Sequence, residues 1–127
     1  MPHLVIDHSA NLDADMPAVC AQLADAMDAT GIFPRAGTRV RAHAATAWVI
    51  ADRREENAYC HMILRMGAGR DMDTKRRAGD AVMPAAQQIF AAHLAAQHFA
   101  LSLEIVEIDA VLTWKQNAMA QRMQGDA

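Results

Sequence analysis

The sequence predicts one α/β (α+β) domain in which two consecutive β-α-β units form a four-stranded sheet with two helices on one face. A chain of 127 residues with 53% hydrophobic content is typical of one globular domain. Strand-like apolar runs alternate with helical patterns along the chain, and the second half repeats the order of the first. We therefore expect a single domain over 1–127, with repeats over about 2–51 and 59–108 and a C-terminal segment over 109–127.

The first unit begins with an apolar run over 2–8, which favours a strand. Asp13 or Asp15 can cap a helix, and Pro17 is tolerated in its first turn. Three apolar residues then recur at a spacing that puts them on one helical face: Val19, Leu23 and Met27. A second, long strand is expected from Thr38 to about Ala51. The predicted order is strand, helix, strand.

The second unit repeats this order. A strand is expected over 59–66, a glycine-containing turn over 67–70, a long helix over 71–99 and a strand over 101–108. Pro84 lies inside the helical pattern, where proline removes a backbone hydrogen bond and clashes with the preceding turn. We therefore expect a kink or a break there.

The two units align when Pro2 to Leu12 is placed over Cys60 to Arg70. The counterpart of Pro2 is then Cys60, and the counterpart of Arg70 is Leu12, so a site that needs both Pro2 and Arg70 is expected once per chain. Right-handed crossovers place both helices on one face of the sheet and leave the other uncovered. A symmetric homo-oligomer that packs sheet faces together is therefore expected.

Composition excludes several classes of function. The net charge is −3 and basic residues form no long block, so neither nucleic acid nor an anionic membrane is expected as a partner. No apolar stretch approaches the roughly 18 residues that span a bilayer, and a cytoplasmic protein is expected. Cys20 and Cys60 are interpreted as buried thiols. The six histidines show no familiar ligand spacing, so no metal site is predicted.

Arginines supply the candidate binding groups. Arg39, Arg41 and His43 alternate along the second predicted strand and so share one face. This pattern is typical of a solvated face or a charged edge strand, or of a carboxylate site, because a guanidinium matches a carboxylate bidentately. Arg70 follows the turn Gly67-Ala68-Gly69, where functional groups are commonly presented.

Pro2 supplies a candidate base. Proline suits the first residue of a strand because it has no backbone N–H. Removal of Met1 would leave Pro2 with a free secondary amine, and a free α-amine has a reference pKa of about 7.7–8.0, close to the operating pH of a general base. Burial and neighbouring Arg39 and Arg70 are expected to disfavour its ammonium form. We expect the mature chain to begin at Pro2.

Four segments carry a resemblance: "MPHLVIDHSANL", "ATGIFPRAGTRVRAH", "HMILRMGAGR" and "LTWKQNAMA". Together they resemble the 5-carboxymethyl-2-hydroxymuconate isomerase family of the tautomerase superfamily. The resemblance implies a tautomerase-like homotrimer whose sites use an amino-terminal proline and no metal or organic cofactor. It identifies Pro2, Arg39 and Arg70 as catalytic, with Arg39 and Arg70 also binding substrate. Arg41 is implied as a substrate-binding residue, and 114–117 as an interface segment.

The resemblance also implies the reaction. A polycarboxylate dienol, 5-carboxymethyl-2-hydroxymuconate, would lose its hydroxyl proton and be reprotonated on carbon to give 5-carboxy-2-oxohept-3-enedioate, in homoprotocatechuate (4-hydroxyphenylacetate) catabolism. The alternatives are a related tautomerase acting on another enol or 2-oxo acid, or a non-catalytic trimeric binding module that retains Met1.

Overall fold

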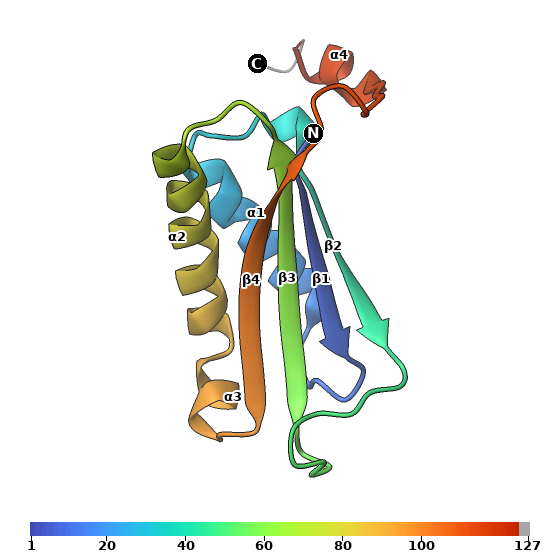
Figure 1. The fold of residues 1–127 in the computed structure, drawn as a ribbon, viewed down its shortest axis with the longest axis vertical. Helices are drawn as coiled ribbons and strands as arrows, with labels where there is room; N and C mark the ends of the chain where they lie inside the picture. The colour runs from blue at the N-terminus through green and yellow to red at the C-terminus, as the bar shows by residue number, and fades with distance from the viewer. Residues whose placement is uncertain (125–127) are drawn as a thin grey trace.

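Four strands form one mixed sheet in the order β2-β1-β3-β4 (Figure 1). The computed structural model describes residues 1–124. Its strands are β1 (His3–Ser9), β2 (Arg39–Ala45), β3 (Ala58–Gly67) and β4 (Phe99–Ile108). β1 runs parallel to β2 and antiparallel to β3, and β3 runs parallel to β4. The beginnings of β1 and β2 therefore lie at the same end of the sheet as the ends of β3 and β4.

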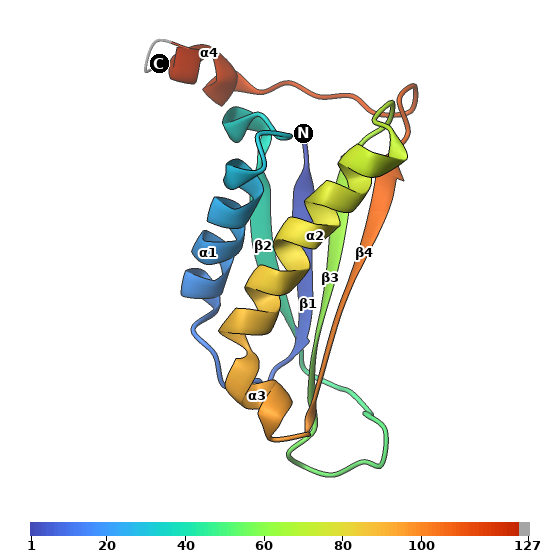
Figure 2. The same ribbon diagram turned by 90° about the vertical axis from the view of Figure 1, so that its left-hand side faces the viewer.

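Two long helices cover one face of this sheet. They are α1 (Met16–Ala29) and α2 (Met72–Ile89), and Figure 2 shows both on the same side of the strands. A 3-10 turn, η1 (Arg35–Gly37), precedes β2, while α3 (Ala91–Ala95) follows α2 and α4 (Ala118–Gln124) follows β4. The predicted four-stranded sheet with helices on one face is confirmed. None of the helices in residues 1–124 is long and apolar enough to cross a membrane.

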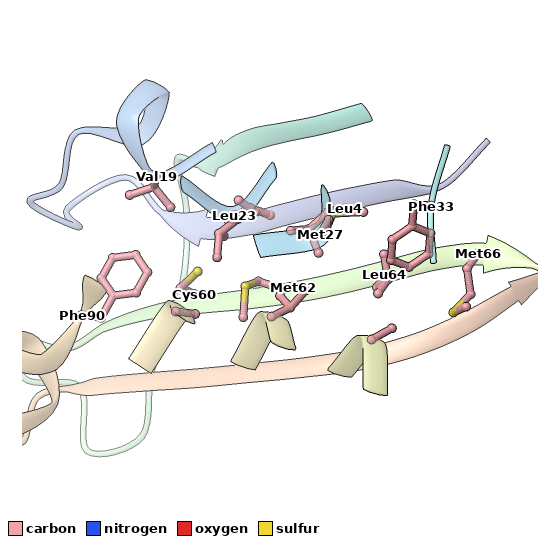
Figure 3. Packing of buried hydrophobic residues seen from close by; sticks show 14 of the residues in the cluster. Leu4, Val19, Leu23, Met27, Phe33, Cys60, Met62, Leu64, Met66 and Phe90 are labelled. Carbon is pink, nitrogen blue, oxygen red and sulfur yellow. The ribbon is translucent and has the colours of Figure 1, made fainter. Parts of the chain in front are cut away.

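The core lies between the sheet and these helices (Figure 3). Every second residue of β3 enters it, because side chains alternate between the two faces of a strand. The buried residues in this core are Leu4, Ile6, Leu12, Val19, Leu23, Met27, Phe33, Ala58, Cys60, Met62, Leu64, Met66, Ala78, Val82, Ala86 and Phe90. The remaining residues of each strand consequently face away from the helices. This alternation decides which side chains of β1 and β2 remain outside the core.

Helix α1 begins where an aspartate can cap it. Of the two candidates, Asp15 is the cap, and its Oδ1 accepts a hydrogen bond from the backbone N–H of Ala18 at 3.1 Å. The helix ends at Ala29, and Gly31 follows with φ of +69°. A positive φ favours glycine, which has no β-carbon. The predicted helix is confirmed, and its turn directs the chain towards η1.

The predicted strand from 38 to 51 is wrong beyond Ala45. The last residue pair between β1 and β2 joins Ser9 to Ala45, and β2 has no other neighbouring strand in the described part of the chain. Because strand hydrogen bonds need a partner, residues 46–57 form a loop instead. The apolar composition of 47–51 is not sufficient to extend the strand.

The predicted helix over 71–99 is also corrected. α2 runs through Pro84 without a break and ends at Ile89, after which Phe90 leaves helical geometry with φ −101° and ψ 21°. The ring of Phe90 is fully buried and its centroid lies 5.1 Å from that of Phe99. We attribute the interruption to this anchoring of Phe90 against β4, which begins at Phe99 rather than at residue 101.

Candidate active site

The sheet topology brings four segments together at one end of the molecule. They are the amino terminus, η1 with the start of β2, the turn after β3, and the segment 109–117 that follows β4. Figure 1 shows the amino terminus at the end of the sheet where β3 and β4 finish, and Figure 2 shows the chain crossing above it towards α4. This meeting point is the candidate active site.

Pro2 is buried immediately before β1. Its carbonyl oxygen accepts a hydrogen bond from the backbone N–H of Arg39 at 3.0 Å, which continues the parallel pairing of β1 and β2. A β-carbon at Gly37 would lie 3.3 Å from Cδ of Pro2. Glycine at this position therefore lets η1 approach the proline ring closely, and the ring is held between η1 and the start of the sheet.

Arg39 folds back over this region instead of extending from the sheet. Its Nη1 donates to the carbonyl oxygens of Ala36 at 2.9 Å and Thr38 at 3.1 Å. Its Nη2 lies 3.8 Å from Sδ of Met1. The backbone of η1 and the start of β2 thus hold the guanidinium beside the amino terminus.

Arg70 reaches the same region from the turn after β3. Its Nη1 donates to the carbonyl oxygen of Gly67 and its Nη2 to that of Ile32, both at 3.3 Å. Its Cζ lies 5.7 Å from the ring centroid of Phe33, at a distance typical of a cation–π contact. Arg70 therefore ties the turn after β3 to the connection that leads into η1.

The free α-amino group lies among several cations. Met1 precedes Pro2 in this structure, so the free amine belongs to Met1 and the Pro2 nitrogen is an amide. Burial lowers the pKa of this amino group, and the charges of Lys115, Arg70 and Arg39 lower it further. The structure thus brings Pro2, Arg39 and Arg70 together. It adds Lys115, which the sequence analysis placed in an interface segment.

The structure does not bring Arg41 into this cluster. Arg41 is exposed on the face of the sheet away from the helices, and its Nη1 lies 3.0 Å from Nδ1 of His3. Because a guanidinium has only donors, Nδ1 of His3 accepts this bond, and a neutral imidazole then carries its proton on Nε2. Burial lowers the pKa of His3, followed by the charges of Arg41, the amino terminus, Arg39 and Arg65. His43 is exposed farther along β2.

A cavity of about 310 Å³ opens beside the amino terminus. It is lined by Met1, His3, Gly67, Ala68, Ile108, Asp109, Ala110, Thr113, Trp114 and Lys115. The sequence assigns Lys115 to an interface segment and gives His3 no special role, so neither is predicted at the site. No local signal in the sequence marks Lys115, because the segment after β4 returns to the end where β1 begins only through the antiparallel pairing of β1 with β3.

Asn117 fixes the segment that carries Lys115. Its Nδ2 donates to the carbonyl oxygen of Ala36 at 2.8 Å, and its Oδ1 accepts from the backbone N–H of Met119 at 3.1 Å. The first bond attaches the segment to η1, and the second begins α4. Asn117 therefore sets the path of the chain over the amino terminus.

Within residues 1–124, the opposite end of the sheet has no equivalent set of groups. Cys60 is buried there, and burial raises its thiol pKa to about 12, with smaller contributions from Asp7 and Cys20. Leu12, the counterpart of Arg70, is part of the core. The chain therefore combines an amino terminus with arginines at one end only. Among residues 1–124, no three His, Cys, Asp or Glu side chains gather in a way that could hold a metal ion.

Comparisons with known proteins identify the family of the chain. The family model for 5-carboxymethyl-2-hydroxymuconate isomerase matches residues 2–123. The 5-carboxymethyl-2-hydroxymuconate Delta-isomerase of Escherichia coli is 39% identical over 119 residues, which cover 92% of this chain and 94% of that protein.

Two crystal structures share both fold and sequence with the chain. A 5-carboxymethyl-2-hydroxymuconate delta-isomerase superposes with a TM-score of 0.87 at 35% identity, covering 98% of this chain and 93% of the other. A 5-carboxymethyl-2-hydroxymuconate isomerase from Deinococcus radiodurans R1 superposes with a TM-score of 0.90 at 34% identity, covering 96% and 93%. The chain therefore belongs to the 5-carboxymethyl-2-hydroxymuconate isomerase family.

Proposed function

We propose that this protein converts 5-carboxymethyl-2-hydroxymuconate to 5-carboxy-2-oxohept-3-enedioate, with Pro2 as the proton-transferring base after removal of Met1. The observation that carries the proposal is the convergence of two arginines on the amino terminus. Nη2 of Arg39 lies 3.8 Å from Sδ of Met1, and Arg70 bonds to Gly67, which lines the same cavity as Met1. Membership of the isomerase family supports the choice of substrate. Within the cell the reaction belongs to homoprotocatechuate catabolism.

The proposed reaction moves one proton and adds no other atom. The neutral amine of Pro2 accepts the proton of the 2-hydroxyl group, and the oxygen's electron pair forms the C2 carbonyl. The diene electrons shift along the chain, so that carbon 5 takes the proton back from the Pro2 ammonium. The double bond that remains is conjugated with the new carbonyl. Pro2 ends the cycle neutral, ready for another substrate.

The cations beside the amino terminus suit this base. A general base must be neutral to accept a proton, and its efficiency is greatest when its pKa lies near the working pH. Burial and the charges of Lys115, Arg70 and Arg39 lower the pKa of the Met1 amino group. The Pro2 nitrogen is one residue further along the same buried chain, so the same cations would keep its free amine neutral.

Arg39 and Arg70 are proposed to bind substrate carboxylates and to stabilise the negative charge of the dienolate. Backbone carbonyls hold both guanidinia in place before substrate arrives, so little reorganisation is needed. Substrate binding by Arg41 stays a prediction. Arg41 bonds to His3, and His3 lines the cavity, so Arg41 would act on the site through His3.

We also propose a homotrimer, with 109–127 as an interface segment. Among the described residues, no helix covers the sheet face that carries Val5, Ile63 and Val106. Trp114 is 85% exposed, and Val111 and Leu112 are also exposed. A partner subunit would cover such apolar surface. Residues 125–127 of this segment lie outside the described residues, and the cytoplasmic location stays a prediction.

The test combines three measurements on the purified protein. Intact mass reports whether Met1 has been removed, and ultraviolet absorbance follows ketonisation of the dienol. Light scattering coupled to size exclusion reports the number of subunits. We expect a chain without Met1, turnover of 5-carboxymethyl-2-hydroxymuconate, and a trimer. Retained Met1 with no turnover would favour the non-catalytic binding module, whereas preference for another enol would favour a related tautomerase.

A further inference from the structure

We propose that Lys115 binds the carboxylate of the substrate's carboxymethyl arm and thereby makes the enzyme prefer the tricarboxylate over the same dienol without that arm. The inference rests on the proposed function, because it names how one part of that substrate is recognised. It concerns substrate binding and leaves the proton transfer to Pro2.

The lining of the cavity beside the amino terminus favours Lys115 as the partner of a bound carboxylate. Lys115 and Met1 both line it, whereas Arg39 and Arg70 do not. A carboxylate in this cavity would therefore meet Lys115 rather than either arginine. The volume of about 310 Å³ is at the lower end of the range for small-molecule sites. It can take one arm of a substrate whose reacting part lies at the amine.

Lys115 also differs from Arg39 and Arg70 in how its hydrogen-bond donors are used. Backbone carbonyls already accept hydrogen bonds from Arg39 and Arg70. Lys115 is exposed, and among residues 1–124 it pairs with no carboxylate. An ammonium group has three donors and sits on a flexible stem. It can therefore turn towards a carboxylate that enters the cavity.

Asp109 is the acidic group that lines the same cavity. Its Oδ1 accepts hydrogen bonds from the backbone N–H groups of Val111 at 2.8 Å and Leu112 at 2.7 Å, and these bonds lower its pKa. The carboxylate is thus used to form the turn after β4. The amino terminus also lies beside the cavity. In its protonated form it attracts an anion, as the ammonium group of Lys115 does.

The chemistry of the substrate assigns the arm to Lys115. Two of its carboxylates are attached directly to the conjugated chain, so their positions are restricted by the planar diene, and the planar fork of a guanidinium matches them. The third is attached through a saturated carbon and can rotate out of the plane. A mobile point charge such as an ammonium suits a mobile carboxylate better than a fixed fork does.

The experiment compares two substrates in four proteins. The substrates are 5-carboxymethyl-2-hydroxymuconate and 2-hydroxymuconate, which is the same dienol without the arm. The proteins are the wild type, Lys115→Gln, Lys115→Arg and Arg53→Gln. Arg53 is an exposed cation of the loop after β2 that lies outside the proposed interface segment and does not line the cavity, so its variant controls for the loss of one positive charge. Kinetics are measured on the pH-independent plateau of each protein.

We expect Lys115→Gln to raise KM for the tricarboxylate roughly tenfold, the loss typical of one charge-assisted hydrogen bond. Its KM for 2-hydroxymuconate should stay at the wild-type value, as should both values for Arg53→Gln. Lys115→Arg should recover part of the loss because it keeps the charge. Equal KM changes for both substrates, or no change for either, would overturn the assignment. A wild type that does not turn over the tricarboxylate would instead refute the proposed function.

Discussion

Arg39 and Asn117 donate hydrogen bonds to the same acceptor, the carbonyl oxygen of Ala36, at 2.9 and 2.8 Å. The first residue begins β2 and the second lies beyond β4, so one carbonyl of η1 connects two distant parts of the chain. A change at Asn117 should therefore affect both the arginine and the segment that carries Lys115.

Asn117→Ala removes the bond to Ala36 and the bond that begins α4. We expect it to lower kcat/KM for the tricarboxylate several-fold and to reduce the free energy of unfolding by about 1 kcal/mol, the contribution of a typical hydrogen bond. Steady-state kinetics and urea denaturation measure the two effects. Gln116→Ala alters the exposed neighbouring residue and should change neither. Similar losses in both variants would show that Asn117 has no special role.

Arg39→Ala and Arg70→Ala should each weaken transition-state binding by about 2 kcal/mol or more, because each removes a cation that pairs with a carboxylate in the site. This corresponds to a fall in kcat/KM of roughly 30-fold. Arg41→Ala is the comparison, and its loss should be smaller because Arg41 contacts His3 rather than the amino terminus. Circular dichroism checks that each variant is folded. A loss in Arg41→Ala as large as in Arg70→Ala contradicts this ranking.

Lys115→Gln should move the acidic limb of the pH profile to higher pH. The base acts when it is neutral, so kcat/KM falls as the pH drops below the amine's pKa. The charge of Lys115 lowers the pKa of the amino group at the amino terminus; removing that charge raises the pKa, and more of the base is protonated at a given pH. The profile is measured with 2-hydroxymuconate, which has no arm to bind. Arg53→Gln should leave the limb unchanged, and a shift to lower pH in Lys115→Gln would contradict the electrostatic argument.

Pro2→Ala should reduce kcat on the order of 100-fold, the lower end of the contribution expected from a positioned general base. The backbone carbonyl at position 2, which accepts from Arg39, is retained, so the pairing of β1 and β2 should persist. Methionine removal would expose a primary amine in the variant, which accounts for a residual rate. Intact mass confirms that wild type and variant are equally processed. Wild-type kcat in the processed variant would rule out the proline-base mechanism.

Local patterns were sufficient for most of the fold. The apolar spacing of Val19, Leu23 and Met27 predicted the buried face of α1, and a capping aspartate marked its beginning. The apolar run over 59–66 predicted β3, and every second residue of that strand is buried in the core. These features depend on residues close together in the sequence, where backbone geometry alone fixes the spacing of side chains. The family segments likewise identified Pro2, Arg39 and Arg70.

Contacts between distant segments were decided only by the tertiary structure. β2 stops at Ala45 because its neighbour β1 ends at Ser9, and α2 stops where Phe90 packs against β4. Alternation placed Arg39 and Arg41 on one face, but hydrogen bonds to the carbonyls of Ala36 and Thr38 turn Arg39 towards the amino terminus.

In the candidate site, too, some features follow from the local sequence, whereas the position of Lys115 depends on contacts between distant segments. The sequence by itself predicted the chemistry at the amino terminus, from a proline that can become an amine and two arginines in a family motif. The structure alone placed Lys115 beside them, because the antiparallel pairing of β1 with β3 returns the chain after β4 to the end where β1 begins. That proximity depends on the assembled sheet, and no local spacing in the sequence encodes it.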